Sequence, residues 1–138
     1  MSCILNIETS TSVCSVALSM DGEVLFAKAS FDGPSHAALL GVFVEEALSV
    51  LKKKGKKALD AVAVSSGPGS YTGLRIGVSV AKGLCFGFGI PLIGIHTLDI
   101  MAATACSKGD SQIVSTTEDL LYCAMLDARR MEVYAAIY

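Results

Sequence analysis

Residues 3–31 read CILNIETSTSVCSVALSMDGEVLFAKASF, and the architecture of the chain follows from them. The apolar run Cys3–Ile7 predicts a buried strand, and the alternation of apolar and small polar residues over Val13–Met20 predicts a second strand. Asp21-Gly22 is typical of a two-residue hairpin turn, so we expect Glu23–Phe31 to return antiparallel as a third strand. The chain therefore opens with a three-stranded meander.

After residue 31 the pattern changes to helices that alternate with strands. Ser35 is suited to cap a helix at its start, and Gly55 follows lysines that suit a helix end. We expect helices over His36–Lys54, Thr72–Phe88 and Thr97–Cys106, strands over Leu59–Ser65, Ile90–Ile95, Leu120–Asp127 and Met131–Tyr138, a polar loop over Lys108–Thr117, and a turn at Ala128-Arg129-Arg130.

This order of elements predicts the α/β class. Strands joined through a helix must run parallel, so the meander and the next two strands form one mixed five-stranded sheet flanked by helices. Such a sheet is the ribonuclease H-like half-domain of the actin, Hsp70 and sugar-kinase superfamily. We expect this lobe in residues 1–109, and a hairpin that begins a second, truncated lobe in residues 110–138.

The composition excludes several classes of protein. Of the 138 residues, 52% are hydrophobic and only 17% are charged, which excludes a disordered chain. The net charge of −2 argues against a protein that coats DNA or RNA, and no apolar run reaches the ~20 residues that span a bilayer. The N-terminus has no basic segment or cleavage site of a signal peptide, so we expect a cytoplasmic protein. The scarcity of charge also indicates a surface that a partner covers.

Residues that bind metals or act as nucleophiles are scattered along the chain. The five cysteines form no Cys-x-x-Cys pair and are expected to be buried, reduced thiols. His36 is followed one helical turn later by Leu40 instead of a second histidine, and no Ser-His-Asp or Cys-His set can be assembled. We therefore expect no catalytic residue and no bound metal.

Two polar turns are candidates for contact with an anion or a nucleotide. Glu8–Thr11 separates the first two strands, but Ser10 stands where a glycine would let backbone amides approach a phosphate. The glycine-rich block Gly67–Gly77 precedes a helix, without the Lys-Ser/Thr of a Walker loop. An ordinary turn and a simple helix cap remain open as alternatives. The candidate residues are Glu8, Thr9, Ser10, Gly69, Ser70, Thr72 and Arg75, with no tight cofactor and at most weak binding of ATP or ADP.

The two long helices predict a surface for a partner. An interior glycine costs about 1 kcal/mol relative to alanine, so Gly73 and Gly77 imply close approach of another backbone, either the chain's own or a partner's. The first helix is apolar over far more than the stripe of about 100° that covers a sheet. We expect a bulky residue at Gly77 or Ala81 to abolish pairing and leave the chain folded. The candidate interface comprises Leu40, Phe43, Val44, Ala47 and Leu51 in the first helix and Gly73, Gly77, Val80, Ala81 and Leu84 in the second.

The sequence resembles the TsaB (YeaZ) family, bacterial subunits of the tRNA threonylcarbamoyladenosine machinery. The resemblance lies in Ile4–Thr11 with Ser15–Leu18, in Gly67–Gly77, in Gly94–Leu98 and in Asp127–Tyr134, and it covers essentially all 138 residues. Two positions depart from the family pattern: Glu8 replaces the usual aspartate, and Asn6 lies within the first strand. Family members continue into a second lobe, so the chain resembles an N-terminal half.

The resemblance implies a non-catalytic role. TsaB-like subunits pair with the catalytic subunit TsaD through their first two helices, the ATPase TsaE binds the pair, and tRNA is contacted indirectly. TsaD carries a His-x-x-x-His metal pair, which this chain lacks because Leu40 stands in the second place. Two alternatives remain open: an ATPase or metallopeptidase-like enzyme of the same superfamily, and a binding module that forms a homodimer when it is alone.

Lysines cluster at the expected end of the first helix. Lys52–Lys54, Lys56 and Lys57 provide five of the 11 basic residues. They either solvate the helix end, where cations favour the helix dipole, or contact phosphates of tRNA. Asp127–Arg130 is similarly either a plain hairpin tip or a polar contact point.

Overall fold

A computed structural model describes residues 2–32, 36–55, 58–108 and 121–138. Its main sheet has five strands in the order β3-β2-β1-β4-β5, and it confirms the predicted meander and the two parallel additions. The chain turns from β2 to β3 through Asp21 and Gly22, whose positive φ angles of 49° and 85° are those of the expected hairpin turn. The strands are β1 (Cys3–Glu8), β2 (Cys14–Met20), β3 (Glu23–Ser30), β4 (Ala61–Ser65) and β5 (Leu92–Ile95).

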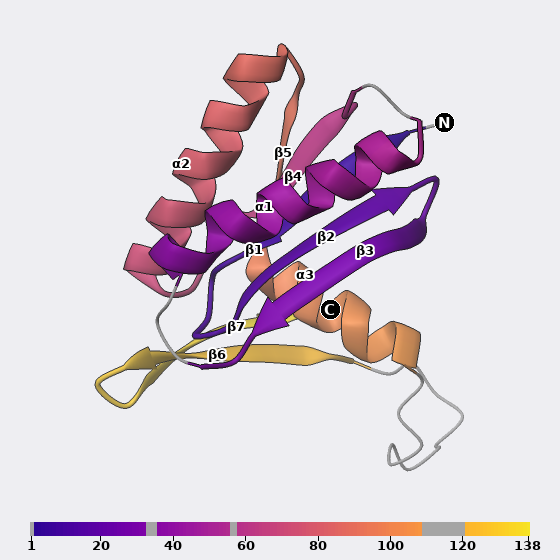
Figure 1. Cartoon of the computed structure of the whole chain (residues 1–138). Helices are drawn as coiled ribbons and strands as arrows, with labels where there is room; N and C mark the ends of the chain where they lie inside the picture. Colours follow the sequence, from indigo (N-terminus) through magenta and orange to yellow (C-terminus); the bar gives the residue numbers. More distant parts are fainter. Residues whose placement is uncertain (1, 33–35, 56–57, 109–120) are drawn as a thin grey trace.

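Two long helices cover one face of this sheet (Figure 1). α1 (His36–Lys53) packs on β2 and β3, and α2 (Tyr71–Phe88) packs on β4. α1 ends at the predicted glycine, since Gly55 has a φ of 76° and its N–H donates to the carbonyl of Lys52. Ser70 caps the start of α2, where its hydroxyl accepts from the N–H of Gly73, and Gly89 ends α2 in a left-handed conformation.

The core lies between these helices and the sheet. The side chains of Leu5 and Leu18 are opposite one another in the β1–β2 ladder, and both are fully buried. The strands contribute alternate residues to this face because successive side chains of a strand point to opposite sides. The buried cluster comprises Cys3, Leu5, Ile7, Cys14, Val16, Leu18, Leu40, Phe43, Val44, Ala47, Leu51, Leu59, Val62, Val64 and Ala81.

A second, smaller unit is formed by the C-terminal elements. α3 (Thr97–Lys108) packs against a hairpin of β6 (Cys123–Arg129) and β7 (Glu132–Ile137), with Leu98, Ala102 and Ala124 buried between them. The hydroxyl of Tyr138 donates to the carboxylate of Asp99, which ties the end of the hairpin to α3. The expected lobe boundary at residues 109–110 and most of the expected polar loop lie outside the described residues, as do Ser35, Lys56 and Lys57.

The hairpin differs from the prediction in its turn. β6 starts at Cys123 and continues to Arg129, and the positive φ angles fall on Arg129, Arg130 and Met131 at 65°, 54° and 63°. The β6–β7 register shifts between Asp127 and Arg129, and the carboxylate of Asp127 accepts from the N–H of Arg129 at 2.7 Å. This irregularity moves the turn one residue beyond its expected place, because it adds a residue to one strand of the ladder.

The topology is that of the predicted ribonuclease H-like half-domain. In the part of the chain that the structure describes, no helix is both long and apolar enough to cross a membrane.

Candidate functional site

The turn between β1 and β2 is the first candidate site, and it is closed on itself. Thr9 and Ser10 are almost completely buried. The carboxylate of Glu8 accepts from the backbone N–H of Ser10 at 2.6 Å and from the hydroxyl of Ser65 at 2.8 Å. The carboxylate therefore occupies an amide and a hydroxyl that a bound phosphate would otherwise use.

The start of α2 is bonded to this same turn. The N–H of Ser70 donates to the carbonyl of Ser10 at 2.6 Å, and the hydroxyl of Thr9 donates to the carbonyl of Gly73 at 2.8 Å. The N–H of Gly73 is directed to the hydroxyl of Ser70. Two of the amides at the N-terminus of α2, those of Ser70 and Gly73, thus have partners within the chain.

The glycines of α2 explain how the helix comes so near. A Cβ atom at Gly73 would lie 2.1 Å from the carbonyl oxygen of Thr9, and one at Gly77 would lie 2.2 Å from the hydroxyl oxygen of Thr9. A Cβ at Gly69 would lie 2.3 Å from the carbonyl oxygen of Ser10. The backbone that approaches these glycines is therefore the chain's own β1–β2 turn, which corrects their expected position on a partner surface.

Most of the residues predicted for an anion site are brought together, and two are not. Glu8, Thr9, Ser10, Gly69 and Ser70 meet where the turn touches α2. Thr72 and Arg75 are instead exposed on the outer side of the helix.

Arg75 has a partner of its own. Its guanidinium lies over the ring of Tyr71, 5.4 Å from the ring centre, and contacts the Tyr71 hydroxyl. The guanidinium therefore has a cation–π partner within its own helix.

His36 is a structural residue at the start of α1. It is buried, and its Nε2 lies 2.9 Å from the carbonyl oxygen of Thr11, so Nε2 carries the proton and donates it. The position one turn later, Leu40, is in the core. Among the described residues, His36 Nδ1 and Ser10 Oγ have no hydrogen-bond partner, and no three histidine, cysteine or acidic side chains are grouped as metal ligands would be.

The α1 residues predicted to face a partner belong to the core. Leu40, Phe43, Val44, Ala47 and Leu51 are each at most 6% exposed because they pack on the sheet. In α2, Ala81 is fully buried, and Val80 and Leu84 are half-buried against the same cluster. The five α1 side chains and Ala81 are not available to another molecule, whereas Val80 and Leu84 keep a partly exposed surface and stay candidates for an interface.

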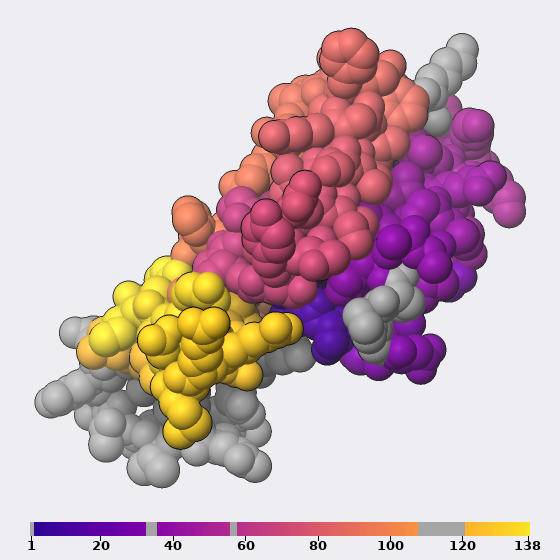
Figure 2. Space-filling model, turned by 90° about the vertical axis from the view of Figure 1, so that its left-hand side faces the viewer, coloured from indigo at the N-terminus to yellow at the C-terminus, as the bar shows by residue number. Residues whose placement is uncertain are grey.

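The outer faces of the two helices mix small or apolar residues with polar ones, which are Glu45 and Ser49 on α1 and Thr72, Arg75, Ser79 and Lys82 on α2. On α1, Ala38, Gly41 and Val42 are exposed, with Val42 at 48%. On α2, Phe86 is 93% exposed, and Gly83 has open space where a Cβ would be. Figure 2 shows α2 as an open surface with α1 beside it. Exposed apolar side chains on neighbouring helices make these faces a candidate site for a protein partner.

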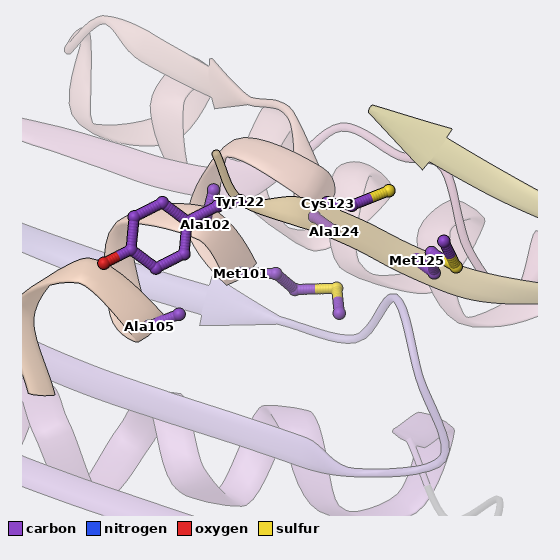
Figure 3. Close-up of a pocket in the computed structure, with 7 residues that line it drawn as sticks. All are labelled: Met101, Ala102, Ala105, Tyr122, Cys123, Ala124 and Met125. Carbon is purple, nitrogen blue, oxygen red and sulfur yellow. The ribbon is translucent and has the colours of Figure 1, made fainter. Parts of the chain in front are cut away.

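A hollow of about 370 Å³ lies between α3 and β6. In Figure 3 the side chain of Met101 extends into it from the helix, and the ring of Tyr122 lies beside Ala102 and Ala105. The remaining lining comes from Cys123, Ala124 and Met125. Among the described residues that line this hollow, the ionisable side chains are the Tyr122 phenol and the Cys123 thiol, and the rest are apolar.

The cysteines are free, as predicted, but only some are buried. Cys3 and Cys14 are in the core, whereas Cys106 and Cys123 are exposed. Burial raises the pKa of the Cys14 thiol, which keeps it protonated and unreactive.

Sequence reasoning missed Ser65 and Tyr71. The signal for Ser65 was the parallel register: Ile7 is opposite Val64, so Glu8 and Ser65 follow at the same edge of the sheet. Tyr71 lies four residues before Arg75, a spacing that places two side chains on one face of a helix.

Comparisons with known proteins agree with this fold. A family model described as "TsaD: tRNA N6-adenosine threonylcarbamoyltransferase" matches residues 32–138. The chain is 39% identical to the tRNA threonylcarbamoyladenosine biosynthesis protein TsaB of Escherichia coli, over 98% of this chain and 54% of that protein. It is 30% identical to TsaB of Bacillus subtilis, over 98% of this chain and 54% of that protein.

A solved structure and a transferase extend the comparison. The structure of YeaZ from Pseudomonas aeruginosa matches with a TM-score of 0.82 and 33% identity, over all of this chain and 60% of that one. A tRNA N6-adenosine threonylcarbamoyltransferase of Nitratidesulfovibrio vulgaris is 38% identical over 71% of this chain and 31% of that protein. The chain spans about half the length of the curated TsaB relatives that it matches.

Proposed function

Because this chain belongs to the TsaD family, and within it to the TsaB (YeaZ) type, we propose that it is a non-catalytic subunit of tRNA threonylcarbamoyladenosine biosynthesis. In this role it pairs with a TsaD-type catalytic subunit through the outer faces of α1 and α2, and it acts in the cytoplasm, where tRNA is modified. The observation that carries the proposal is that both helices leave apolar side chains exposed, Val42 on α1 and Phe86 on α2, with open space at Gly83.

The small residues on these faces suit helix-to-helix packing. Gly41 and Ala38 on α1 and Gly83 on α2 leave no long side chain between the backbone and a partner. Phe86 supplies the large aromatic side chain that protein interfaces favour at their centre. The same surface can bring two copies of the chain together when no TsaD-type subunit is present.

Three features support a non-catalytic role. Leu40 occupies the second place of the metal pair and is in the core, so no ligand can be supplied from that position. His36 holds the β1–β2 turn through its Nε2. The carboxylate of Glu8 already accepts from the Ser10 amide, which would have to be released before a nucleotide phosphate could bind there. We therefore propose that the chain holds no nucleotide tightly and that TsaE supplies ATPase activity to the assembly.

Substitution at Gly83 tests the pairing surface. Gly83 is exposed and a Cβ atom there would have no neighbour within 4 Å, so we expect Gly83→Trp to leave the far-UV circular dichroism and the unfolding midpoint nearly unchanged. It should raise the dissociation constant for a purified TsaD-type subunit by at least about tenfold, because an indole would separate the helices.

The matched control is Gly77→Trp. Its side chain would collide with Thr9 inside the chain, so this variant should fail to fold, contrary to the expectation from sequence that it would disrupt pairing alone.

Unchanged affinity of the Gly83→Trp variant for the TsaD-type subunit would contradict the proposed surface. Tight binding and turnover of Mg-ATP by the purified chain, measured by calorimetric titration, would contradict the non-catalytic role.

A further inference from the structure

The C-terminal end of α1 carries an unusual concentration of positive charge. Lys52 and Lys53 form the last turn, Lys54 follows directly, and all three are exposed. Five of the chain's 11 basic residues fall between positions 52 and 57, although the net charge is −2. The side chains of Lys52–Lys54 make no ion pair or hydrogen bond with the residues that the structure describes, whereas Lys28 is paired with Glu46.

The helix end does not by itself require so many cations. The negative end of a helix dipole is equivalent to about half an elementary charge, which one or two lysines already balance. The acidic side chains on the neighbouring connections have partners: Asp21 accepts from the N–H of Ser2 at 2.7 Å, and Asp60 accepts from the N–H of Cys3 at 2.6 Å. Adjacent lysines also repel one another, so the cluster is at its most favourable when an external anion lies against it.

The described part of the chain on either side of the cluster, from residue 43 to residue 70, lacks the anchors of a protein interface. In the described parts of residues 43–70 there is no exposed large hydrophobic side chain, and none of these residues is an arginine. A protein interface would be expected to have aromatic or apolar anchors at its centre, and base recognition would need aromatic side chains or arginine. Lysine ammonium groups alone suit the phosphates of a nucleic-acid backbone.

We propose that Lys52, Lys53 and Lys54 bind backbone phosphates of tRNA and orient it on the assembled complex without reading its sequence. The proposal rests on the proposed function, which brings tRNA to the complex. The end of α1 lies at the same side of the molecule as the N-terminus, far from the β6–β7 hairpin (Figure 1). Lys52 is ten residues beyond Val42, about 15 Å along the helix, so the lysines remain accessible when the first half of α1 is paired.

The test uses the full chain in complex with its TsaD-type subunit and measures tRNA binding at several salt concentrations. The triple variant K52Q/K53Q/K54Q should bind tRNA at least about tenfold more weakly near 0.15 M salt. Its plot of log affinity against log salt should be shallower by about 2–3, since each lost phosphate contact removes roughly 0.7–0.9 from the slope. The matched control K52R/K53R/K54R keeps the charges and should retain both the affinity and the slope.

The competing outcomes are distinguishable. Unchanged affinity and slope in an intact glutamine-variant complex would overturn the phosphate contact and leave the proposed function standing. If gel filtration showed that the glutamine variant no longer pairs with the TsaD-type subunit, the lysines would instead contact an acidic protein surface. That result would also overturn the proposed phosphate contact. Failure of the unmodified chain to pair with the TsaD-type subunit would instead overturn the proposed function.

Discussion

At the scale of single residues, the glycines of α2 have two different roles. Gly73 and Gly77 face Thr9 at distances that no Cβ atom could occupy, whereas Gly83 and Gly87 face open space. Both kinds carry the same helix-propensity cost of about 1 kcal/mol relative to alanine. At Gly73 and Gly77 this cost is offset by the hydrogen bond from Thr9 to Gly73 and by the packing around it. At Gly83 our proposal is that contact with a partner offsets it.

Alanine substitutions separate these two roles. Gly73→Ala should lower the free energy of unfolding by about 1–3 kcal/mol, because the new methyl group collides with the Thr9 carbonyl. Gly83→Ala should raise it by about 0.5–1 kcal/mol, because alanine is the better helix former and nothing obstructs it. Urea unfolding at constant m-value measures both, and a stabilised Gly73→Ala variant would show that the turn can move away.

The pH dependence of stability has a clear sign at Tyr138. Its hydrogen bond to Asp99, reinforced by burial and by the carboxylate charge, raises the pKa of the Tyr138 phenol above its ordinary value of 10.0. Because the pKa is raised in the folded state, the contribution of this hydrogen bond to the free energy of unfolding is fully present below pH 10.0. It is lost as the pH rises through the folded-state pKa.

The free energy of unfolding of Tyr138→Phe should therefore fall less on raising the pH above 10.0 than that of the unmodified chain. Ultraviolet titration of the tyrosines should also show that the substitution removes the phenol that ionises at the highest pH. If the titration instead loses a tyrosine with an ordinary pKa, the bond to Asp99 does not persist in solution.

The candidate site could be predicted only in part from its residues. The gathering of Glu8, Thr9, Ser10, Gly69 and Ser70 followed from two turns at the same edge of a parallel sheet. That Glu8 would turn its carboxylate back onto the Ser10 amide could not be predicted, because that depends on a side-chain rotamer and on Ser65 from another strand.

At the scale of elements, α1 shows why apolar periodicity alone was misleading. The sequence indicated that the helix is apolar on more than one face, and the side chains assigned to a partner included its phenylalanine and two of its leucines, Leu40 and Leu51. These are the residues that the sheet takes, because burying leucine and phenylalanine contributes most to folding. The face left outside carries Ala38, Gly41 and Val42 together with the polar Glu45 and Ser49, so the residues left for the proposed interface are smaller than those predicted from the sequence.

A surface ion pair joins α1 to the edge strand β3. The ammonium group of Lys28 lies 2.6 and 2.8 Å from the two carboxylate oxygens of Glu46, and 5.0 Å from the centre of the Phe43 ring. Glu46→Gln should lower the free energy of unfolding by about 0.5 kcal/mol at low salt and by less at high salt, since both side chains are about 40% exposed.

Glu45→Gln is the control for this ion pair. Its side chain is exposed and makes no hydrogen bond or ion pair with the described residues, so chemical unfolding of this variant should match that of the unmodified chain. If Glu45→Gln and Glu46→Gln lowered the free energy of unfolding by the same amount, the effect would come from net charge and not from the ion pair with Lys28.

At the scale of the whole molecule, the order of elements and the sheet topology followed from sequence, because period-two and helical patterns alternate clearly. The ends of the helices and strands differed from the predicted ends by one to three residues. β5, for example, begins at Leu92 rather than Ile90. The division of the core into a large cluster and a small one was not foreseen, since it depends on contacts between α3 and β6 that are distant in sequence.

This division predicts unequal local stability. The large cluster joins β1, β2 and β4 to both long helices, whereas three buried residues, Leu98, Ala102 and Ala124, hold the hairpin to α3. Amide hydrogens of β1, β2 and β4 should therefore exchange at least about tenfold more slowly than those of β6 and β7. Similar exchange rates, measured by mass spectrometry or NMR, would mean that both sheets unfold as one unit.

The seating of the β1–β2 turn against the glycines of α2 has a mechanical consequence. No side chain lies between Gly73 and the Thr9 carbonyl to act as a cushion, and the two segments are also fastened by a hydrogen bond. A molecule that presses on the outside of α2 therefore pushes directly on the loop that leaves the central strand. Contact on the exposed side of α2 would thus be separated from the central strand β1 only by the backbone of one helix and one turn.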